Sequence, residues 1–119
     1  MYEYKAMITR VVDGDTFDAE VDVGFSITIK HRFRLTEIDT PETWRPKSNA
    51  EAEHGAKCTS FVKQLMEMKQ VLIKSNKLGI YGRYEASVTL PDGQNLATLL
   101  IENGFEKLDS YPEDSDDKI

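Results

Sequence analysis

The sequence contains only one cysteine, Cys58, which excludes an intramolecular disulfide. It also lacks long apolar runs: no stretch approaches the roughly 18 apolar residues that cross a bilayer, and residues 1–5 do not begin a signal peptide. These absences favour a reducing compartment. We therefore expect a cytoplasmic protein with no membrane partner, although a mature secreted form stays open.

Basic residues are scarce for a protein that binds nucleic acid. There are 15 Lys and Arg against 21 Asp and Glu, a formal net charge of −6, whereas nucleic-acid-binding domains usually carry a basic field. Part of the acidity is local, because residues 113–119 contain four acids and one lysine. A metal site made of carboxylates would account for much of the rest.

The chain has the length and composition of one globular domain. Its 119 residues, with 39% hydrophobic and 30% charged, can bury a single modest core. We assign residues 1–109 to this domain, which we expect to be a monomer. Residues 110–119 are predicted to form an acidic, disordered tail.

Three strands are predicted before the first helix. Residues 4–12 form the first, and Gly14 can adopt the unusual backbone angles of the turn that ends it. Apolar and polar residues alternate over residues 17–23 and 25–35, which is the period of half-buried strands. Gly24 between them indicates a hairpin turn.

A helix is predicted next. Ser48 and Glu51 have the spacing of a capping box, and apolar residues recur at helical spacing up to about Met68. Because glycine is unfavourable inside a helix, the start could instead lie near Gly55.

Two more strands, residues 70–75 and 84–90, follow this helix, and a short helix from Leu96 stops at Gly104. This order predicts a mainly β fold with helices (α+β), a five-stranded Greek-key barrel of the OB type. A short α+β sheet sandwich is the alternative, since element order alone does not separate the two.

Two carboxylates, Asp13 and Asp15, lie two residues apart and would project to the same side of an extended chain. Hard cations prefer such oxygen clusters, but a polar turn between two strands would look the same. An EF-hand loop beginning at Asp13 is excluded, because Phe17 and Gly24 stand at its fifth and twelfth positions.

A second polar cluster surrounds Pro41, which stiffens the turn after the third strand. Asp39 and Glu42 could bind a metal or act as general base, and Arg34 could fork onto phosphate oxygens. Arg83 would supply the second donor that a pentacoordinate phosphate requires. Taken singly, each of these residues could instead be structural.

Two other groups also have simpler interpretations. His54 and Cys58 lie four apart on the predicted helix, but two ligands make no zinc site, and we assign Cys58 to the core. Lys30, Arg32 and Arg34 share one strand face, which could follow a phosphate backbone or merely keep the strand soluble.

Residues 12–16, 34–35, 39–43 and 81–83 together resemble, in order and spacing, the three signatures of the staphylococcal nuclease (thermonuclease) family. The resemblance extends from about residue 5 to residue 108. It implies a calcium-dependent nuclease that hydrolyses DNA, RNA or both and leaves 3′-phosphate ends. By this resemblance, we expect the family's third, C-terminal helix to be absent.

The resemblance also implies the metal site. Ca²⁺ would be held by the side chains of Asp15 and Asp39 and by the carbonyl oxygen of Thr40, while Asp13 would support a bound water. These assignments follow from the positions that match the family's motifs.

The resemblance likewise implies the groups that act on substrate. Glu42 matches the proposed general base, and Arg34 and Arg83 match the residues that grip the phosphate. Tyr81 matches a tyrosine near the terminal phosphate, and Tyr111 could replace the family's base-stacking tyrosines.

Two other classes of function are compatible with parts of this pattern. One is a non-catalytic nucleic-acid-binding OB-fold module, and the other is a calcium-binding structural domain. A pure binder has no physical reason to keep a base and two arginines facing a metal, and a structural calcium site would not need the arginines. The full set of polar side chains therefore favours the enzyme.

Overall fold

The structure is a computed structural model that describes residues 2–41, 43, 46–78 and 84–111. Its elements, in chain order, are β1 (Tyr2–Asp13), β2 (Thr16–Asp22), β3 (Thr28–Leu35), α1 (Asn49–Met66), β4 (Gln70–Leu78), β5 (Tyr84–Thr89) and α2 (Leu96–Glu102). The predicted strands and helices are therefore present, with some boundaries shifted by a few residues.

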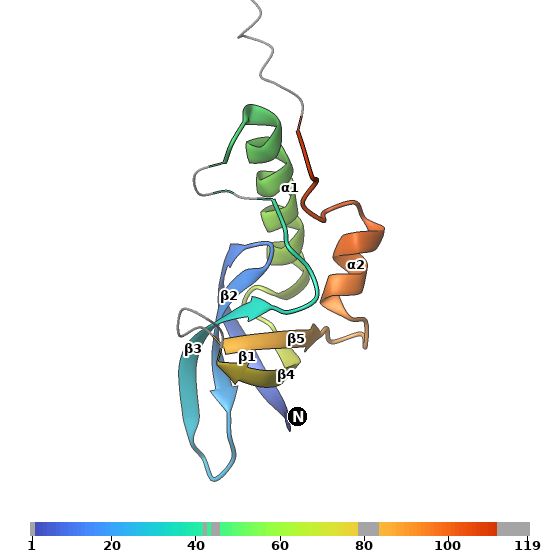
Figure 1. Ribbon diagram of the computed structural model, residues 1–119. Coiled ribbons are helices and arrows are strands. Elements are labelled where there is room, and N and C mark those ends of the chain that lie inside the picture. Colours follow the sequence, from blue (N-terminus) through green and yellow to red (C-terminus); the bar gives the residue numbers. More distant parts are fainter. Residues whose placement is uncertain (1, 42, 44–45, 79–83, 112–119) are drawn as a thin grey trace, which may run out of the picture.

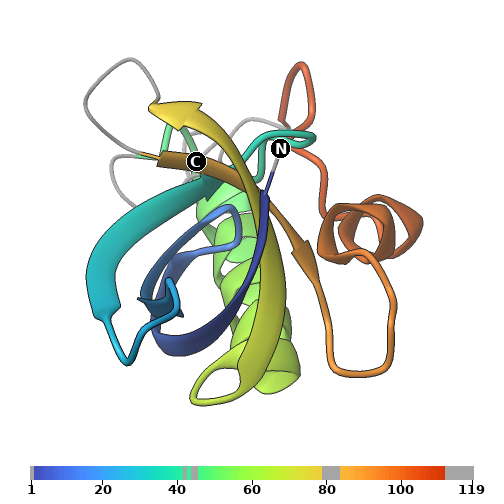
Figure 2. The same cartoon turned by 90° about the horizontal axis from the view of Figure 1, so that it is seen from below.

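The five strands close into a barrel in the order β1-β2-β3-β5-β4. Neighbouring strands are antiparallel, except that β3 and β5 run parallel over residues 33–35. This closed Greek-key order is that of an OB fold, so the predicted fold class is confirmed and the sandwich alternative is wrong. In Figure 1, α1 stands at one end of the barrel and the β2–β3 hairpin projects from the other end. Figure 2 shows α2 outside the barrel, beyond β5.

The barrel core is formed by alternate strand residues and by one face of α1. Fully buried side chains from these elements include Ile8, Phe17, Leu35, Val62 and Met66. The rings of Phe17 and Phe33 stack with centroids 5.7 Å apart, which joins β2 to β3. Burial of each large apolar side chain contributes about 1.5–3 kcal/mol. The core therefore holds the strand ends in place, and the polar motif residues lie beside these ends.

Helix α1 begins at its predicted cap. The Ser48 hydroxyl accepts a hydrogen bond from the Glu51 backbone N–H at 3.1 Å, and Glu51 Oε1 accepts one from the Lys47 N–H at 2.8 Å. These bonds satisfy N–H groups at the start of the helix. The alternative start near Gly55 is wrong, because the capped helix begins at Asn49 and buries Gly55 in its interior.

Gly14 has a different role from the one predicted. Its φ angle is not in the left-handed region; instead, a Cβ atom at this position would lie 2.3 Å from Cys58 Sγ and 3.0 Å from Thr40 Oγ1. The β1–β2 turn therefore needs glycine because it packs directly onto α1 and the Thr40 loop. This close approach brings the turn and the Asp39–Thr40 corner together.

The β2–β3 hairpin is more exposed than its alternating pattern predicted. Phe25 is 97% exposed, Ile27 53% and Ile29 37%, and β3 begins only at Thr28. The pattern is that of a half-buried strand, but the hairpin extends past the end of the barrel (Figure 1), so nothing covers its apolar face in the part of the chain that the structure describes. The predicted turn at Gly24 is confirmed by its φ of 89°.

The second helix ends as predicted. Gly104, with φ of 77°, follows the Asn103 cap and allows the chain to turn back toward α1. Residues 112–119 lie outside the described residues, so the predicted tail is not tested.

Candidate functional site

Asp15 is the most enclosed of the predicted metal-binding side chains. Its Oδ1 accepts a hydrogen bond from the Thr16 hydroxyl at 3.1 Å, and its Oδ2 accepts one from the Thr40 backbone N–H at 3.2 Å. The residue is only 7% exposed. The β1–β2 turn and the corner after β3 are thus joined through one carboxylate.

Arg34, near the end of β3, lies between Asp15 and Asp39. Its Nη2 is 3.4 Å from Asp15 Oδ2 and also donates to Asp39 Oδ1. Burial disfavours the charged guanidinium, but the hydrogen bond to Asp39 and the charges of both carboxylates outweigh it, so the pKa of Arg34 is raised. The structure therefore brings together three of the residues that the sequence singled out.

The corner after β3 is also tied to the β1–β2 turn by Asp13, whose Oδ1 accepts a hydrogen bond from the Thr43 hydroxyl. Three predicted residues, Glu42, Tyr81 and Arg83, lie outside the described residues. Their predicted roles therefore stay predictions.

Lys107 supports the Asp39 corner from behind, a contact that the sequence pattern does not predict. The Lys107 backbone N–H donates to the Asp39 carbonyl oxygen at 2.8 Å, and Lys107 Nζ lies 3.5 Å from Glu51 Oε2. The Glu51 side chain is only 1% exposed, so this ion pair has a buried acid. The local pattern predicts a role for Glu51 only in the helix cap, because it carries no signal for a lysine so distant in the chain.

Tyr111 is held against α1. Since His54 Nε2 lies 2.7 Å from the Gly104 carbonyl oxygen, Nε2 donates there. In a neutral imidazole Nδ1 then accepts from the Tyr111 hydroxyl, 2.7 Å away. The same hydroxyl accepts from the Leu108 N–H at 3.2 Å. Base stacking by Tyr111 is not tested and stays a prediction.

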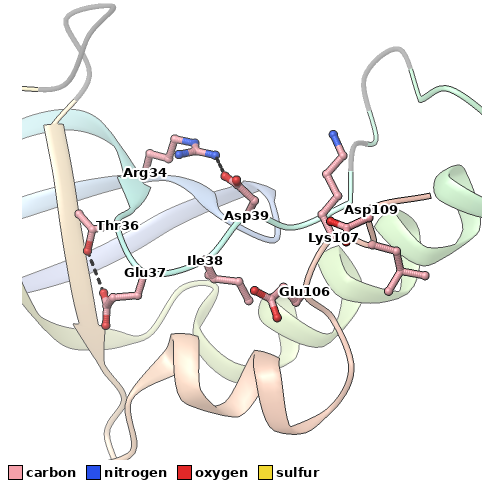
Figure 3. A pocket seen from close by; sticks show the side chains of 9 residues that line it. Arg34, Thr36, Glu37, Ile38, Asp39, Glu106, Lys107 and Asp109 are labelled. Carbon is pink, nitrogen blue, oxygen red and sulfur yellow. Dashed lines mark hydrogen bonds and ion pairs between the residues drawn. The ribbon is translucent and has the colours of Figure 1, made fainter. Parts of the chain in front are cut away.

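A pocket of about 510 Å³ opens between the corner after β3 and the segment that follows α2 (Figure 3). Its lining is strongly polar and charged, and consists of Arg34, Thr36, Glu37, Ile38, Asp39, Glu106, Lys107, Leu108 and Asp109. Arg34 and Asp39 therefore belong to an accessible depression at the protein surface.

The other basic residues of the β3 face are paired with acids on β2. Arg32 Nε bonds to Asp18 Oδ1 at 2.7 Å, and Lys30 Nζ lies 3.5 Å from Glu20 Oε1. The hydrogen bond from Arg32 lowers the pKa of Asp18. Of these three basic residues, Arg34 is the one that contacts both candidate metal-binding carboxylates.

The chemistry of the donor set fits a hard cation. In the described parts of the chain, no three His, Cys, Asp or Glu side chains form a group that could hold a metal ion. Asp15 and Asp39, however, converge on one cationic group, the Arg34 guanidinium. Ca²⁺ takes roughly six to eight oxygen ligands, so two carboxylates would leave the other positions to carbonyl and water oxygens.

The described structure also bears on two simpler predictions. Cys58 is fully buried, which confirms its assignment to the core. Within the described residues, no helix has both the length and the apolar composition that a bilayer crossing requires.

Fold and site together define an OB-fold barrel with two carboxylates and an arginine where β1 and β3 end and β2 begins. A family model described as staphylococcal nuclease homologue matches residues 32–119. The chain belongs to the staphylococcal nuclease family, as its motifs predicted. The matched residues include Arg34 and Asp39, whereas Asp15 lies before them.

Several curated proteins are similar in sequence. Endonuclease YhcR of Bacillus subtilis (strain 168) is 30% identical over 110 residues, 87% of this chain and 9% of the relative. An uncharacterized endonuclease of Escherichia coli O157:H7 is 30% identical over 97 residues, 82% of this chain and 56% of the relative. Staphylococcal nuclease domain-containing protein 1 of Schizosaccharomyces pombe is 26% identical over 121 residues, 98% of this chain and 13% of the relative. The chain thus spans at most 56% of the length of these relatives.

Proposed function

We propose that the chain is a calcium-dependent nuclease that hydrolyses phosphodiester bonds in DNA, RNA or both. The observation that carries this proposal is the convergence of Asp15 and Asp39 on Arg34. Two carboxylates can hold a divalent cation, and a guanidinium beside them can bind a phosphate. Membership of the family and the two relatives named endonucleases support the proposal.

The proposed cation site uses Asp15, Asp39 and the carbonyl oxygen of Thr40, with Asp13 orienting a nearby water. Bound Ca²⁺ would neutralise phosphate charge and favour attack by water. The hydrogen bonds from Thr16 and Thr40 to Asp15 hold that carboxylate in one orientation before any ligand arrives. Such preorganisation reduces the rearrangement that binding requires.

The proposed reaction is hydrolysis with departure of the 5′ oxygen. Glu42 accepts a proton from water as the water oxygen bonds to phosphorus, and the bond to the 5′ oxygen breaks. The departing 5′ oxygen takes a proton from solvent water, so the products are a 3′-phosphate and a 5′-hydroxyl. Arg34 and Arg83 bind the non-bridging oxygens, where negative charge develops. Tyr81 and Tyr111 are proposed to contact the nucleotide.

A cleavage assay tests this function. The protein is incubated with end-labelled single-stranded DNA, double-stranded DNA and RNA, in Ca²⁺ or in excess EGTA, and the new ends are identified by mass spectrometry. We expect cutting only with Ca²⁺, and 3′-phosphate ends. Asp39→Asn should lower turnover by about a hundredfold or more, because it removes a charged metal ligand.

The matched control is Asp18→Asn, which makes the same charge change at a carboxylate paired with Arg32 on the barrel wall. We expect it to retain wild-type turnover. Undiminished cutting in EGTA would contradict the calcium requirement. Oligonucleotide binding without cutting under every condition would favour the non-catalytic OB-fold module instead.

A further inference from the structure

Arg34 lies where the two candidate metal-binding carboxylates meet. Its Nη2 contacts both Asp15 Oδ2, at 3.4 Å, and Asp39 Oδ1, and Figure 3 shows the contact with Asp39. The Asp15 side chain is only 11% exposed and that of Arg34 is 32% exposed. A carboxylate with so little access to water needs a nearby positive charge.

We propose that Arg34 is an internal cation that competes with Ca²⁺ for Asp15 and Asp39. This inference rests on the proposed function, because it assumes that Ca²⁺ uses these carboxylates. Without metal, the guanidinium offsets one of the two carboxylate charges. When a divalent cation takes the carboxylate oxygens, Arg34 loses its partners and becomes available to a phosphate, so metal binding prepares the phosphate-binding group.

The neighbouring basic residues show that this arrangement is specific to position 34. Arg32 and Lys30 share the strand face with Arg34, but their ion pairs are made across the strands with Asp18 and Glu20. Removing either of them would change the net charge without removing a contact to Asp15 or Asp39. They therefore provide internal controls for long-range electrostatics.

The expected size of the competition follows from Coulomb's law. A unit charge about 5 Å from a divalent cation opposes its binding strongly even when the effective dielectric constant is well above that of dry protein. Screening by solvent reduces the effect, because Arg34 is partly exposed. We expect replacement of Arg34 by a neutral side chain to tighten Ca²⁺ binding by about tenfold.

Titration calorimetry with CaCl₂ alone, in the absence of nucleic acid, tests the inference independently of catalysis. Arg34→Met should bind Ca²⁺ about tenfold more tightly than wild type. Arg34→Lys keeps the charge but loses the planar fork, so its affinity should fall between the two. Arg32→Met removes an equal charge beside the site and should stay within about twofold of wild type.

Thermal unfolding gives a second readout that also serves if the variant is too unstable for calorimetry. Without metal, Arg34→Met should unfold at a lower temperature than wild type, because Asp15 loses its counter-charge, and saturating Ca²⁺ should raise its Tm by more than it raises that of wild type. A Ca²⁺ affinity in Arg34→Met equal to or weaker than that of wild type would overturn the internal-cation role and leave the proposed nuclease intact. Failure of both proteins to bind Ca²⁺ would overturn the calcium site and this inference together.

Discussion

At the scale of single residues, the candidate site depends on how closely the β1–β2 turn approaches α1. Cys58 lies beneath Gly14, and burial, followed by the negative charge of Asp15, raises the pKa of the thiol to about 12. The thiol therefore stays protonated at neutral pH and packs as a small apolar group. Glycine at position 14 and cysteine at position 58 fit one another as a pair.

This contact predicts that Gly14→Ala will destabilise the protein by about 1–3 kcal/mol, because the added methyl group would lie against Cys58 Sγ. Urea unfolding measures the change in the free energy of unfolding. Gly14→Ala combined with Cys58→Ala should be less destabilised than the sum of the two single variants. Additive effects would show that the sulfur contact is not the cause.

At the scale of elements, the tip of the β2–β3 hairpin has a backbone conformation that its residues disfavour. The Ile27 N–H donates to the Gly24 carbonyl oxygen at 2.9 Å, and the central residues Phe25 and Ser26 have φ of 55° and 62°. Both angles are those of a type I′ turn, which favours Asn-Gly. A bulky, exposed phenylalanine is therefore unfavourable here.

We predict that the double variant Phe25→Asn and Ser26→Gly will be more stable than wild type by about 1 kcal/mol, because both residues tolerate positive φ. Chemical denaturation provides the measurement. A loss of stability in the hairpin variant would mean that the apolar tip has contacts that stabilise the fold.

The segment after α2 supports the candidate site. The Lys107 N–H in this segment donates a hydrogen bond to the Asp39 carbonyl oxygen, and Tyr111 bonds the segment to His54 on α1. Tyr111→Phe removes the hydroxyl that bonds His54 and Leu108, and should lower the free energy of unfolding by about 1 kcal/mol. Because the ring remains, oligonucleotide affinity should change little if Tyr111 stacks on a base. Equal oligonucleotide affinities in Tyr111→Ala and wild type would exclude base stacking.

At the scale of the whole molecule, charge opposes the proposed substrate. The formal net charge of −6 includes four acids in residues 113–119. Like charge near a polyanion raises the free energy of approach, and salt screens it. On an acidic protein, a bound divalent cation and the two proposed phosphate-binding residues, Arg34 and Arg83, would therefore have to attract the nucleic acid locally.

We predict that a chain ending after Pro112 will bind oligonucleotides more tightly at low salt, and that the difference will shrink as ionic strength rises. Fluorescence titration at two salt concentrations measures both effects. A chain in which the four tail acids are replaced by their amides provides a control of equal length. Identical affinities for the full-length and shortened chains at low salt would remove any role for the tail charge.

Local sequence patterns are enough to predict the order of strands and helices, the cap of the first helix, the glycine that ends the second and the residues of the polar motifs. These features depend on local physics: alternation marks strands, Ser48 and Glu51 mark the start of α1, and Gly104 marks the end of α2. The motif residues 12–16, 34–35, 39–43 and 81–83 together also sufficed to predict the family that the family model then showed.

Which of these residues come into contact depends on the way the chain folds in three dimensions. The contact of Arg34 with two carboxylates, the approach of Gly14 to Cys58 and the pairing of Lys107 with Glu51 join parts of the chain that local pattern leaves independent. The alternating pattern likewise does not predict the exposure of the β2–β3 hairpin. Alternation shows that a segment is a strand, but it does not show how much of that strand the barrel covers. Barrel closure sets the distances from Arg34 to the two carboxylates, since it fixes the strand ends relative to one another, whereas the other two contacts depend on how the helices pack on the barrel.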